Sequence, residues 1–339
     1  MIDDQKLGSY LEQHMDGFAG PLTLKKFAGG QSNPTFLITA KSGKYVLRRK
    51  PPGKLLKSAH AVDREYQVTR ALAGTDVPVA TPRHLCTDDS VIGSWFYIMD
   101  YVEGRIFWDP ALPEAGNSER AAMYHEMNRV LAAIHSVDLR TQGLEDYGRP
   151  GNYFQRQVSR WTKQYKASET EDIAPMDQLI QWVSANIPQD DGTCGLIHGD
   201  YRLDNFIFHP VKPEIIAVVD WELSTLGHPL ADLAYQSMQW RMPHESIVRG
   251  LDGIDRDALG IPTEEDYVRE YATRMGLGGI DHWPFYLAFS FFRLAAIVQG
   301  VMKRSLDGNA SSARAQEVGR LTRPLAEKAI SVLNEYQKL

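Results

Sequence analysis

The sequence predicts an α+β chain of two lobes, in which a small antiparallel sheet precedes a larger and mainly helical part. Three observations predict this class. At 339 residues the chain is longer than a single hydrophobic core usually serves. Short runs rich in β-branched and aromatic residues fill residues 22–101, whereas long stretches with helical spacing follow residue 104. We therefore expect an N-terminal lobe over residues 1–102 and a C-terminal lobe over residues 103–339.

The N-terminal lobe is expected to contain four strands and one helix. The strands correspond to the runs LTLKKFAG, TFLITA, KYVLRR and SWFYIMDYV. The turn signal at residues 41–43, Lys-Ser-Gly, separates the second run from the third and favours an antiparallel pairing. Between the third and fourth runs, Ser58–Ala73 has apolar residues at helical spacing, with Ser58 as a candidate N-cap.

The C-terminal lobe is expected to be helical apart from one hairpin. Helical patterns cover Ser118–Ser136, Tyr153–Lys166, Pro175–Asn186, Thr263–Met275 and Trp283–Lys303. The most apolar stretch begins at Trp283 and is interrupted by Arg293 and Gln299. A charge near the centre of a membrane-spanning helix is costly, so we expect a buried helix of a soluble protein.

One island of β-type sequence lies inside this helical part. Asn205–His209 and Glu214–Asp220 are short, largely apolar runs separated by a turn that contains proline. This is the pattern of a β-hairpin. A polar residue lies at each end of the hairpin, Asn205 at its start and Asp220 at its end, and we expect both side chains at the hairpin mouth.

Composition and charge narrow the classes of function. The 37 Lys and Arg residues face 43 Asp and Glu residues, and this net charge of -6 gives no field to attract nucleic acid or an anionic membrane. Cys86 and Cys194 form neither a CxxC motif nor a Cys/His cluster, so neither a disulfide framework nor a zinc site is indicated. The N-terminus lacks a basic region followed by an apolar stretch, so no signal peptide is expected, and we expect a cytoplasmic protein.

Three polar side chains have the pattern that phosphoryl transfer requires. This chemistry needs Mg²⁺ held by hard oxygen ligands, a carboxylate that positions the attacking hydroxyl, and cations on the phosphates. Asp200 and Asn205 are separated by four residues, the spacing of the kinase catalytic loop, in which the Asp meets the acceptor hydroxyl and the Asn binds metal. Asp220 follows a buried apolar strand and is the expected second metal ligand. Each residue alone could be a turn or cap residue, but the ordered set favours an enzyme.

The segment HGDYRLDN, followed by a strand that ends at Asp220, resembles the catalytic core of the aminoglycoside phosphotransferase and choline kinase superfamily, which has a protein-kinase-like fold. The run GHPLADLA is similar to the next motif of that superfamily, in which the residue matching Asp232 braces the catalytic loop through hydrogen bonds. The residue matching His198 also braces the loop in the superfamily. We favour this role over proton transfer because Asp200 is the better-placed base.

Further motifs are similar to those of the kinase domains fused to acyl-CoA dehydrogenases in animals. In order along the chain these motifs are GGQSNPTF, YVLRRKPPG, DREYQV, VIGSWFYIMDYVEGRIF, RQVSRWTKQY and HGDYRLDNFIFHP. The resemblance covers about residues 28–310, and the shared order of the motifs makes chance a poor explanation. It implies a two-lobed kinase-like fold with ATP and Mg²⁺ as cofactors.

Candidate nucleotide-binding residues lie in the N-terminal lobe. Gly30 and Ser32 join two expected strands, where the backbone either approaches phosphate oxygens or forms a plain hairpin turn. Arg48 stands where protein kinases have the lysine of V-A-I-K, and its planar guanidinium can still grip phosphate oxygens. Its neighbours Arg49 and Lys44 are alternatives, although strand alternation places Arg49 on the opposite face.

Two further segments of this lobe have counterparts in kinases. Glu65, on the expected helix, matches the kinase residue that orients the phosphate-binding cation, but a solvated carboxylate beside Arg64 would have the same pattern. The segment that contains Asp100 and Val102 resembles the hinge that binds adenine through backbone groups.

The sequence gives weaker evidence for the residues that bind the phosphate acceptor. Arg202 either neutralises phosphate or pairs with Asp204. The expected helix that begins at Tyr153 has four cations on one side, namely Arg156, Arg160, Lys163 and Lys166. This basic face could hold an anionic substrate, such as the phosphates of coenzyme A, or could simply be solvated.

The predicted function is therefore ATP-dependent phosphorylation of a hydroxyl on a small metabolite, for example a hydroxyacyl-CoA, with an acyl-CoA dehydrogenase as a partner in the same pathway. No nucleic acid or membrane partner is expected. One alternative is an aminoglycoside-modifying phosphotransferase, which a cationic surface would disfavour. The other is a catalytically silent kinase-like binding module, which would not need the complete metal set.

Overall fold

The computed structural model describes residues 2–27, 33–51, 61–308 and 314–337. The contacts within the chain divide it into two compact units. The first unit consists of Met1–Ile106, Arg140–Leu144 and Asn205–Ser224, and the second of Phe107–Leu139, Glu145–Asp204 and Thr225–Leu339. A small antiparallel sheet and a larger helical portion are present, as the sequence predicted.

The first unit is built on an antiparallel sheet, which has five strands in the described residues. The strands are β1 (Leu22–Lys26), β2 (Thr35–Ala40), β3 (Gly43–Arg49), β4 (Pro82–Cys86) and β5 (Phe96–Asp100), in the order β1-β2-β3-β5-β4. β4 was not predicted. On β3, Arg48 lies opposite Thr35 of β2 on one side and Tyr97 of β5 on the other. Because β3 is paired along both edges, the register of Arg48 is fixed.

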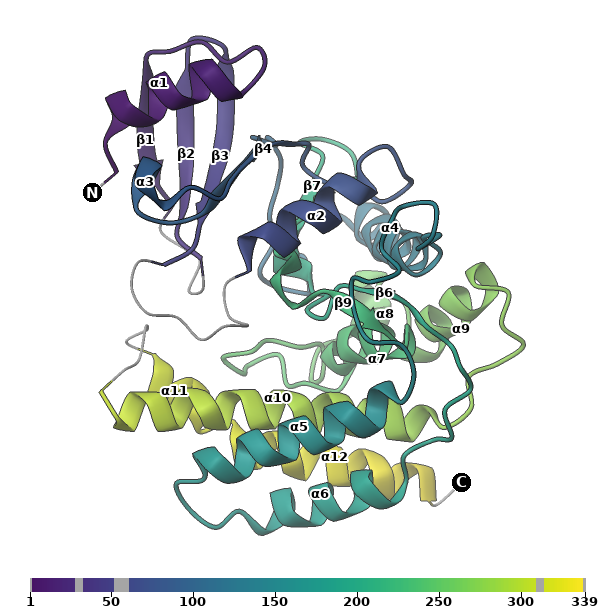
Figure 1. Ribbon diagram of the computed structural model, residues 1–339. Coiled ribbons are helices and arrows are strands. Elements are labelled where there is room, and N and C mark those ends of the chain that lie inside the picture. The colour runs from purple at the N-terminus through teal and green to yellow at the C-terminus, as the bar shows by residue number, and fades with distance from the viewer. Residues whose placement is uncertain (1, 28–32, 52–60, 309–313, 338–339) are drawn as a thin grey trace. The chain divides into compact units, whose positions relative to one another are not determined.

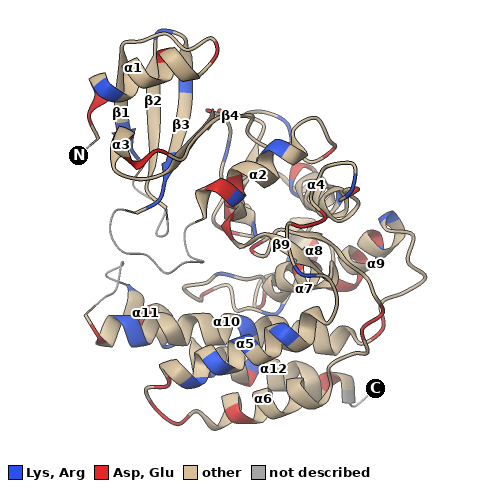
Figure 2. Ribbon diagram, viewed as in Figure 1, with Lys and Arg blue, Asp and Glu red and all other residues tan. Residues whose placement is uncertain are grey.

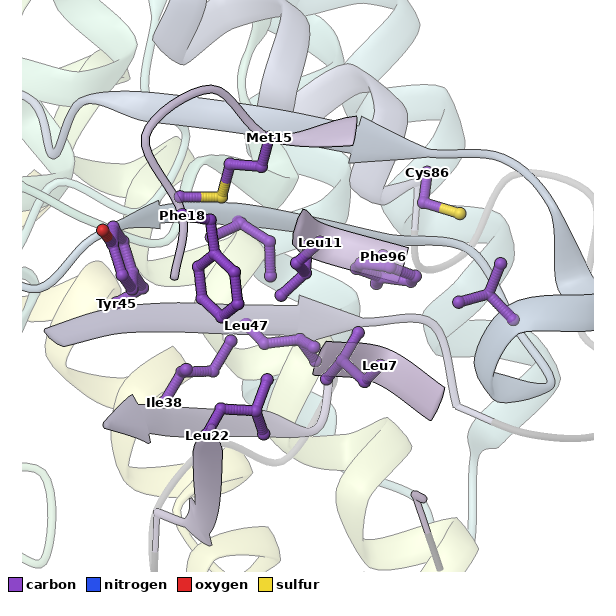
Figure 3. Packing of buried hydrophobic residues seen from close by; sticks show 12 residues of the cluster. Leu7, Leu11, Met15, Phe18, Leu22, Ile38, Tyr45, Leu47, Cys86 and Phe96 are labelled. Carbon is purple, nitrogen blue, oxygen red and sulfur yellow. The ribbon is translucent and has the colours of Figure 1, made fainter. Parts of the chain in front are cut away.

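Helix α1 (Asp4–His14) packs on this sheet with its apolar side (Figure 3). The side chain of its N-cap, Asp3, accepts hydrogen bonds of 3.0 Å from the backbone N–H groups of Gln5 and Lys6. The packed layer contains Leu7, Leu11, Met15, Phe18, Leu22, Ile38, Tyr45, Leu47, Cys86, Val91, Phe96 and Ile98. Burying one such aliphatic or aromatic side chain contributes about 1.5–3 kcal/mol, so this layer holds α1 on the sheet. The short helix α3 (Asp89–Ile92) adds Val91 to it.

Helix α2 (Val62–Leu72) carries the predicted Glu65. The helix contacts β4, β5 and the 3-10 turn η2 (Trp221–Leu223). The Glu65 side chain is only 1% exposed, so it is not the solvated carboxylate that the sequence left open. The candidate N-cap, Ser58, lies outside the described residues.

The predicted hairpin is present as β7 (Phe206–Phe208) and β8 (Ile215–Val218). The backbone of this hairpin forms hydrogen bonds with other segments of the first unit. Phe208 and Arg105 exchange two N–H···O hydrogen bonds of 2.8 Å, and the Val218 N–H donates to the Pro78 carbonyl at 2.8 Å. These bonds explain why Asn205–Ser224 groups with the first unit, whereas the predicted division after residue 102 placed it in the C-terminal lobe.

The described part of the second unit contains the remaining helices, which are α4 (Asn117–His135), α5 (Tyr153–Ser168), α6 (Ala174–Ala185), α7 (Leu230–Ser237), α8 (Arg256–Leu259), α9 (Glu264–Arg274), α10 (Trp283–Leu306), α11 (Ala315–Gly319) and α12 (Thr322–Gln337). The five predicted helices are present within three residues of their expected bounds. α1, α3, α7, α8, α11 and α12 were not predicted.

Helix α10 is central to this unit and contacts α5, α6, α7, α11 and α12 (Figure 1). Among the described residues it is the one helix long and apolar enough to cross a membrane, but 78% of its most apolar window is buried inside the protein. The predicted burial of this segment is confirmed.

A short two-stranded ladder lies beside these helices. β6 (Gly195–Ile197) pairs antiparallel with β9 (Thr225–Gly227), so that Leu196 lies opposite Leu226. The segment that begins with His198 follows β6 directly and contains the 3-10 turn η1 (Leu203–Asn205). α7 begins shortly after β9 and leads into the 3-10 turn η3 (Met238–Trp240).

The close approach of Gly104 to the hairpin generates a prediction on stability. A Cβ atom at Gly104 would lie 2.3 Å from the Phe208 carbonyl oxygen and 2.5 Å from Cγ2 of Ile207. Gly104→Ala must therefore shift the β7 backbone. We expect its free energy of unfolding to fall by about 2 kcal/mol or more, as overpacked sites do, in a urea titration.

The matched control is Gly278→Ala, since a Cβ atom at Gly278 would meet nothing within 4 Å. We expect this variant to unfold within about 0.5 kcal/mol of the wild type. Equal losses in the two variants would contradict the importance of the close approach at Gly104.

Candidate active site

A buried carboxylate, Asp232 on α7, holds the backbone that follows β6. Its two oxygens accept hydrogen bonds from the backbone N–H groups of His198, at 2.6 Å, and Gly199, at 2.9 Å. His135 Nε2 lies 3.5 Å from the same carboxylate. Burial alone would raise the pKa of Asp232, but the hydrogen bond and charge of His135, together with His198, hold the pKa below its ordinary value.

These contacts turn the chain sharply before Asp200. Gly199 has a φ of +82°, in the left-handed region that glycine tolerates without strain. The backbone N–H of Asp200 donates to Nδ1 of His198, at 3.2 Å, and the His198 side chain is buried. The geometry therefore gives His198 and Asp232 backbone partners in the turn, while their bracing role in the reaction stays a prediction.

The Asp200 side chain has a defined partner. The Tyr235 hydroxyl, on α7, donates a hydrogen bond of 2.8 Å to Asp200 Oδ1. Arg293, on α10, donates to the Gly199 carbonyl at 2.5 Å and lies with its guanidinium carbon 5.1 Å from the centroid of the Tyr235 ring. Both ends of the turn are thus held by the helices of the second unit.

Arg48, the residue in the place of the kinase lysine, lies among carboxylates in the first unit. Its Nε is 2.9 Å from Glu65 Oε2, and its Nη2 is 2.5 Å from Asp220 Oδ1 and 3.5 Å from Glu222 Oε2. Burial lowers the pKa of Arg48, but the negative charges around it, those of Glu65 and Asp220 first, together raise the pKa by more, so the net shift is upward. The guanidinium stays charged and links the sheet to the residues after the hairpin.

Glu65 is the most enclosed member of this group. Besides Arg48 it contacts Asn33, whose Nδ2 donates at 2.8 Å, and Tyr97, whose hydroxyl donates at 3.2 Å. Burial raises the pKa of Glu65 to about 7 against the opposing charge of Arg48, and the nearby carboxylates of Asp220 and Glu222 raise it too. The sheet, α2 and the hairpin segment therefore meet in a single network of polar side chains.

The two predicted metal ligands come from adjoining backbone positions. The Val219 N–H donates to the Asn205 carbonyl at 2.9 Å, so Asn205 lies beside the residue that precedes Asp220. Asp220 has φ 65° and ψ 56°, a left-handed conformation that Asp and Asn tolerate better than other side chains. A carboxylate and an amide oxygen are hard donors of the kind that Mg²⁺ prefers. This donor set fits Mg²⁺, and the metal-binding role stays a prediction.

The other predicted nucleotide-binding residues are less informative. Gly30 and Ser32 lie outside the described residues. Asp100 ends β5, where its N–H donates to the Thr81 carbonyl at 2.9 Å and its carboxylate accepts two hydrogen bonds from Arg83. The Asp100 side chain is thus committed to Arg83, and any adenine contact must come from backbone atoms, as the resemblance implied for Asp100 and Val102.

A pocket of about 450 Å³ lies beside the loop that contains Asp200, within the second unit. Its lining includes Trp108, Arg202, Tyr235, Met238, Met242 and Leu294. The choice left open for Arg202 has a structural answer, because its Nε lies 2.5 Å from Asp204 Oδ1. Tyr235 borders the pocket and also contacts Asp200, so the pocket adjoins the expected catalytic carboxylate.

The four cations of the basic face lie along α5 (Figure 2). Two of them have partners within the unit. Lys166 pairs with Glu169 and Asp177, each at 2.7 Å, and Arg156 donates to the Arg149 carbonyl at 2.6 Å. Arg160 and Lys163 are exposed. The face is therefore less available to an anionic substrate than the sequence alone indicated.

The residues of this site that were not predicted include Tyr97, Glu222, Tyr235 and Arg293. A signal existed for two of them. Tyr235 follows Asp232 by three residues and so shares its face of a helix. Arg293 is a cation inside an otherwise apolar helix, which required a buried partner. Tyr97 and Glu222 had no such signal, because their partners are distant in sequence.

Comparisons with known proteins identify the family of this chain. A model of the phosphotransferase enzyme family matches residues 23–271. Mouse acyl-CoA dehydrogenase family member 10 is 51% identical over 325 residues, which cover 94% of this chain. The alignment covers only 30% of that relative, so the chain spans less than a third of its length.

Solved structures share the fold. A Ralstonia eutropha protein provisionally named an aminoglycoside phosphotransferase is 51% identical, with a TM-score of 0.91 over 99% of both chains. A mutant of aminoglycoside phosphotransferase APH(4)-Ia, solved with AMP-PNP and hygromycin B, has a TM-score of 0.62 over 97% of both chains at 16% identity. The family model spans most of the chain and the relatives match nearly all of it, so the chain belongs to the phosphotransferase enzyme family and has the kinase-like fold that its sequence predicted.

Proposed function

We propose that this protein transfers the γ-phosphoryl group of ATP, with Mg²⁺, to a hydroxyl group of a small metabolite. The observation that carries the proposal is the set of three oxygen-bearing side chains on two anchored backbone segments. Asp200 follows a turn held by Asp232, while Asn205 and Asp220 flank the β7–β8 hairpin. A binding module would not need this set.

Each side chain has a role in the proposed reaction. Mg²⁺, when bound by Asn205 and Asp220, would neutralise charge on the phosphates. Asp200 orients the acceptor hydroxyl and accepts its proton. Little nucleophilic push is needed in a loose transition state, so positioning supplies most of the contribution of Asp200.

Two observations support nucleotide binding, one from a side chain of the sheet and one from a solved structure with the same fold. Arg48 presents a charged, planar guanidinium on the central strand of the sheet, and such a group can grip phosphate oxygens. The APH(4)-Ia relative was solved with an ATP analogue. We therefore propose ATP as the donor, with backbone atoms near Asp100 and Val102 as the adenine site.

For the acceptor we propose a hydroxyacyl-CoA or a similar hydroxylated, partly apolar metabolite. The pocket beside the catalytic loop offers the apolar side chains of Met238, Met242 and Leu294, which suit an acyl group better than a polycationic sugar. The similarity to an acyl-CoA dehydrogenase family member supports the same class and a dehydrogenase in the same pathway.

The acceptor class can be tested directly by ADP release from Mg-ATP with different acceptors. The screen compares 3-hydroxybutyryl-CoA, hygromycin B, choline and glucose, with Asp200→Asn as the blank. Acceptor-dependent turnover on the hydroxyacyl-CoA supports the proposal. Turnover on hygromycin B alone would assign an aminoglycoside-modifying enzyme instead.

We predict that Asp200→Asn lowers turnover by about two to four powers of ten, the range of a positioned acid–base group. The substitution keeps the size of the side chain and removes its negative charge, whereas the metal ligands are untouched. Mg-ATP affinity, measured by calorimetry, should stay within about threefold of wild type. Near-wild-type turnover would show that Asp200 is not the catalytic carboxylate.

We predict that Asp220→Asn weakens Mg-ATP binding by at least about tenfold, because an amide replaces a charged metal ligand. Asn is chosen since it tolerates the left-handed backbone of Asp220, which Ala does not. Calorimetry with and without Mg²⁺ measures the effect. Unchanged Mg-ATP affinity in the folded variant would remove Asp220 from the metal site.

A further inference from the structure

We propose that Tyr235 is a positioning residue for the reaction, which holds the Asp200 carboxylate in the orientation that meets the acceptor hydroxyl. This inference rests on the proposed function and adds a residue to it. Its basis is the hydrogen bond of 2.8 Å from the Tyr235 hydroxyl to Asp200 Oδ1.

Tyr235 and Asp232 act from the same helix. They are three residues apart on α7, so they lie on the same face of the helix, about one turn apart. Asp232 holds the loop backbone through His198 and Gly199, and Tyr235 holds the Asp200 side chain. One rigid element therefore fixes both the path of the turn and the direction of its carboxylate.

The direction of this hydrogen bond is settled by chemistry. Burial raises the pKa of Tyr235 well above its ordinary value, and the charge of Asp200 raises it further. The phenol keeps its proton at physiological pH and can only donate to the carboxylate. A hydrogen bond to an ionised acceptor is stronger than one between neutral groups, so losing it would free the rotation of Asp200.

Arg293 supports the same arrangement from α10. It is only 7% exposed, although it lies in an apolar helix. Its guanidinium faces the rings of Tyr235, at 5.1 Å, and Trp161, at 5.8 Å, and donates to the Gly199 carbonyl. A buried cation at this place restrains the tyrosine ring and the turn together, which explains the charge that interrupts the apolar sequence.

The pocket places Tyr235 next to the acceptor as well. Tyr235 lines the 450 Å³ pocket and also donates a hydrogen bond to Asp200. The ring forms part of the wall and the hydroxyl reaches the carboxylate. Removing the hydroxyl alone should therefore leave the wall in place and affect the orientation of Asp200.

The test is Tyr235→Phe, assayed by ADP release with the acceptor that the screen identifies. We expect kcat to fall about tenfold, which equals about 1.4 kcal/mol of barrier. The KM values for Mg-ATP and acceptor should stay within about twofold, because the ring and the metal ligands remain. A loss confined to kcat is the mark of an effect on the transition state.

Tyr124→Phe is the matched control. Tyr124 is buried like Tyr235, and its hydroxyl donates to the Pro110 carbonyl at 2.6 Å, so this variant loses a buried hydrogen bond that does not involve Asp200. We expect it to keep the wild-type kcat while its thermal midpoint falls as much as that of Tyr235→Phe. A kcat loss equal to that of Tyr235→Phe would assign both effects to stability and overturn the inference.

A double-mutant cycle gives the second readout. In the Asp200→Asn background the charged acceptor is gone, so adding Tyr235→Phe should lower the remaining rate less than about threefold. An equal factor in both backgrounds would mean that Tyr235 does not act through Asp200, which would overturn the inference. So would a folded Tyr235→Phe protein with wild-type kcat.

Failure of the proposed function has a different outcome. Wild-type protein that releases no ADP with any acceptor would overturn the phosphotransferase proposal and this inference together. Active wild type with loss in Asp200→Asn, but none in Tyr235→Phe, would overturn the role of Tyr235 alone.

Discussion

The turn that precedes Asp200 depends on one carboxylate, Asp232, that the fold keeps charged although it is 1% exposed. Taking a carboxylate out of water is costly unless hydrogen bonds and opposite charge replace the lost hydration. Two backbone N–H groups of the turn and His135 supply that replacement. If the turn moved away, the buried Asp232 carboxylate would lose these hydrogen bonds, so the turn is held in place. Asp200 obtains a fixed backbone in this way while its own side chain stays accessible.

In the first unit a buried cation has the corresponding role, because carboxylates surround it and pair with it. Arginine at position 48 can do what lysine cannot, since its planar fork directs Nε to Glu65 and Nη2 to Asp220 at the same time. Burial raises the pKa of Glu65 despite its ion pair with Arg48, and the neighbouring carboxylates, which outnumber the cation, raise it too. A second positive charge at Asp220 would relieve this imbalance, so the network is consistent with a divalent cation as a partner of Asp220.

The sequence was sufficient to predict the elements whose signal is local. The long helices from Asn117 to Leu306 and the β7–β8 hairpin have clear periodicity, so their positions agree with the structure within three residues. The sequence could not show that the hairpin groups with the first unit, because the bonds from Arg105 and Pro78 join segments about 100 residues or more apart. The same limit applies to the site. Asp200, Asn205 and Asp220 were found from spacing, whereas Glu222 and Tyr97 are defined by contacts with Arg48 and Glu65 that no spacing records.

The fold does not decide the substrate of this family member, because a solved structure at 16% identity with hygromycin B bound shares the fold. We therefore attribute substrate selection to the side chains around the pocket. Two of their cations form ion pairs with neighbouring carboxylates. Arg202 pairs with Asp204, and Arg249 pairs with Asp109 at 2.5 Å. Paired charges cost less to leave in place than to separate, so they offer little to a polycationic or polyanionic ligand. Besides these pairs the wall offers apolar surface, so the proposed acceptor, which has an apolar segment next to its hydroxyl, would gain most from that surface.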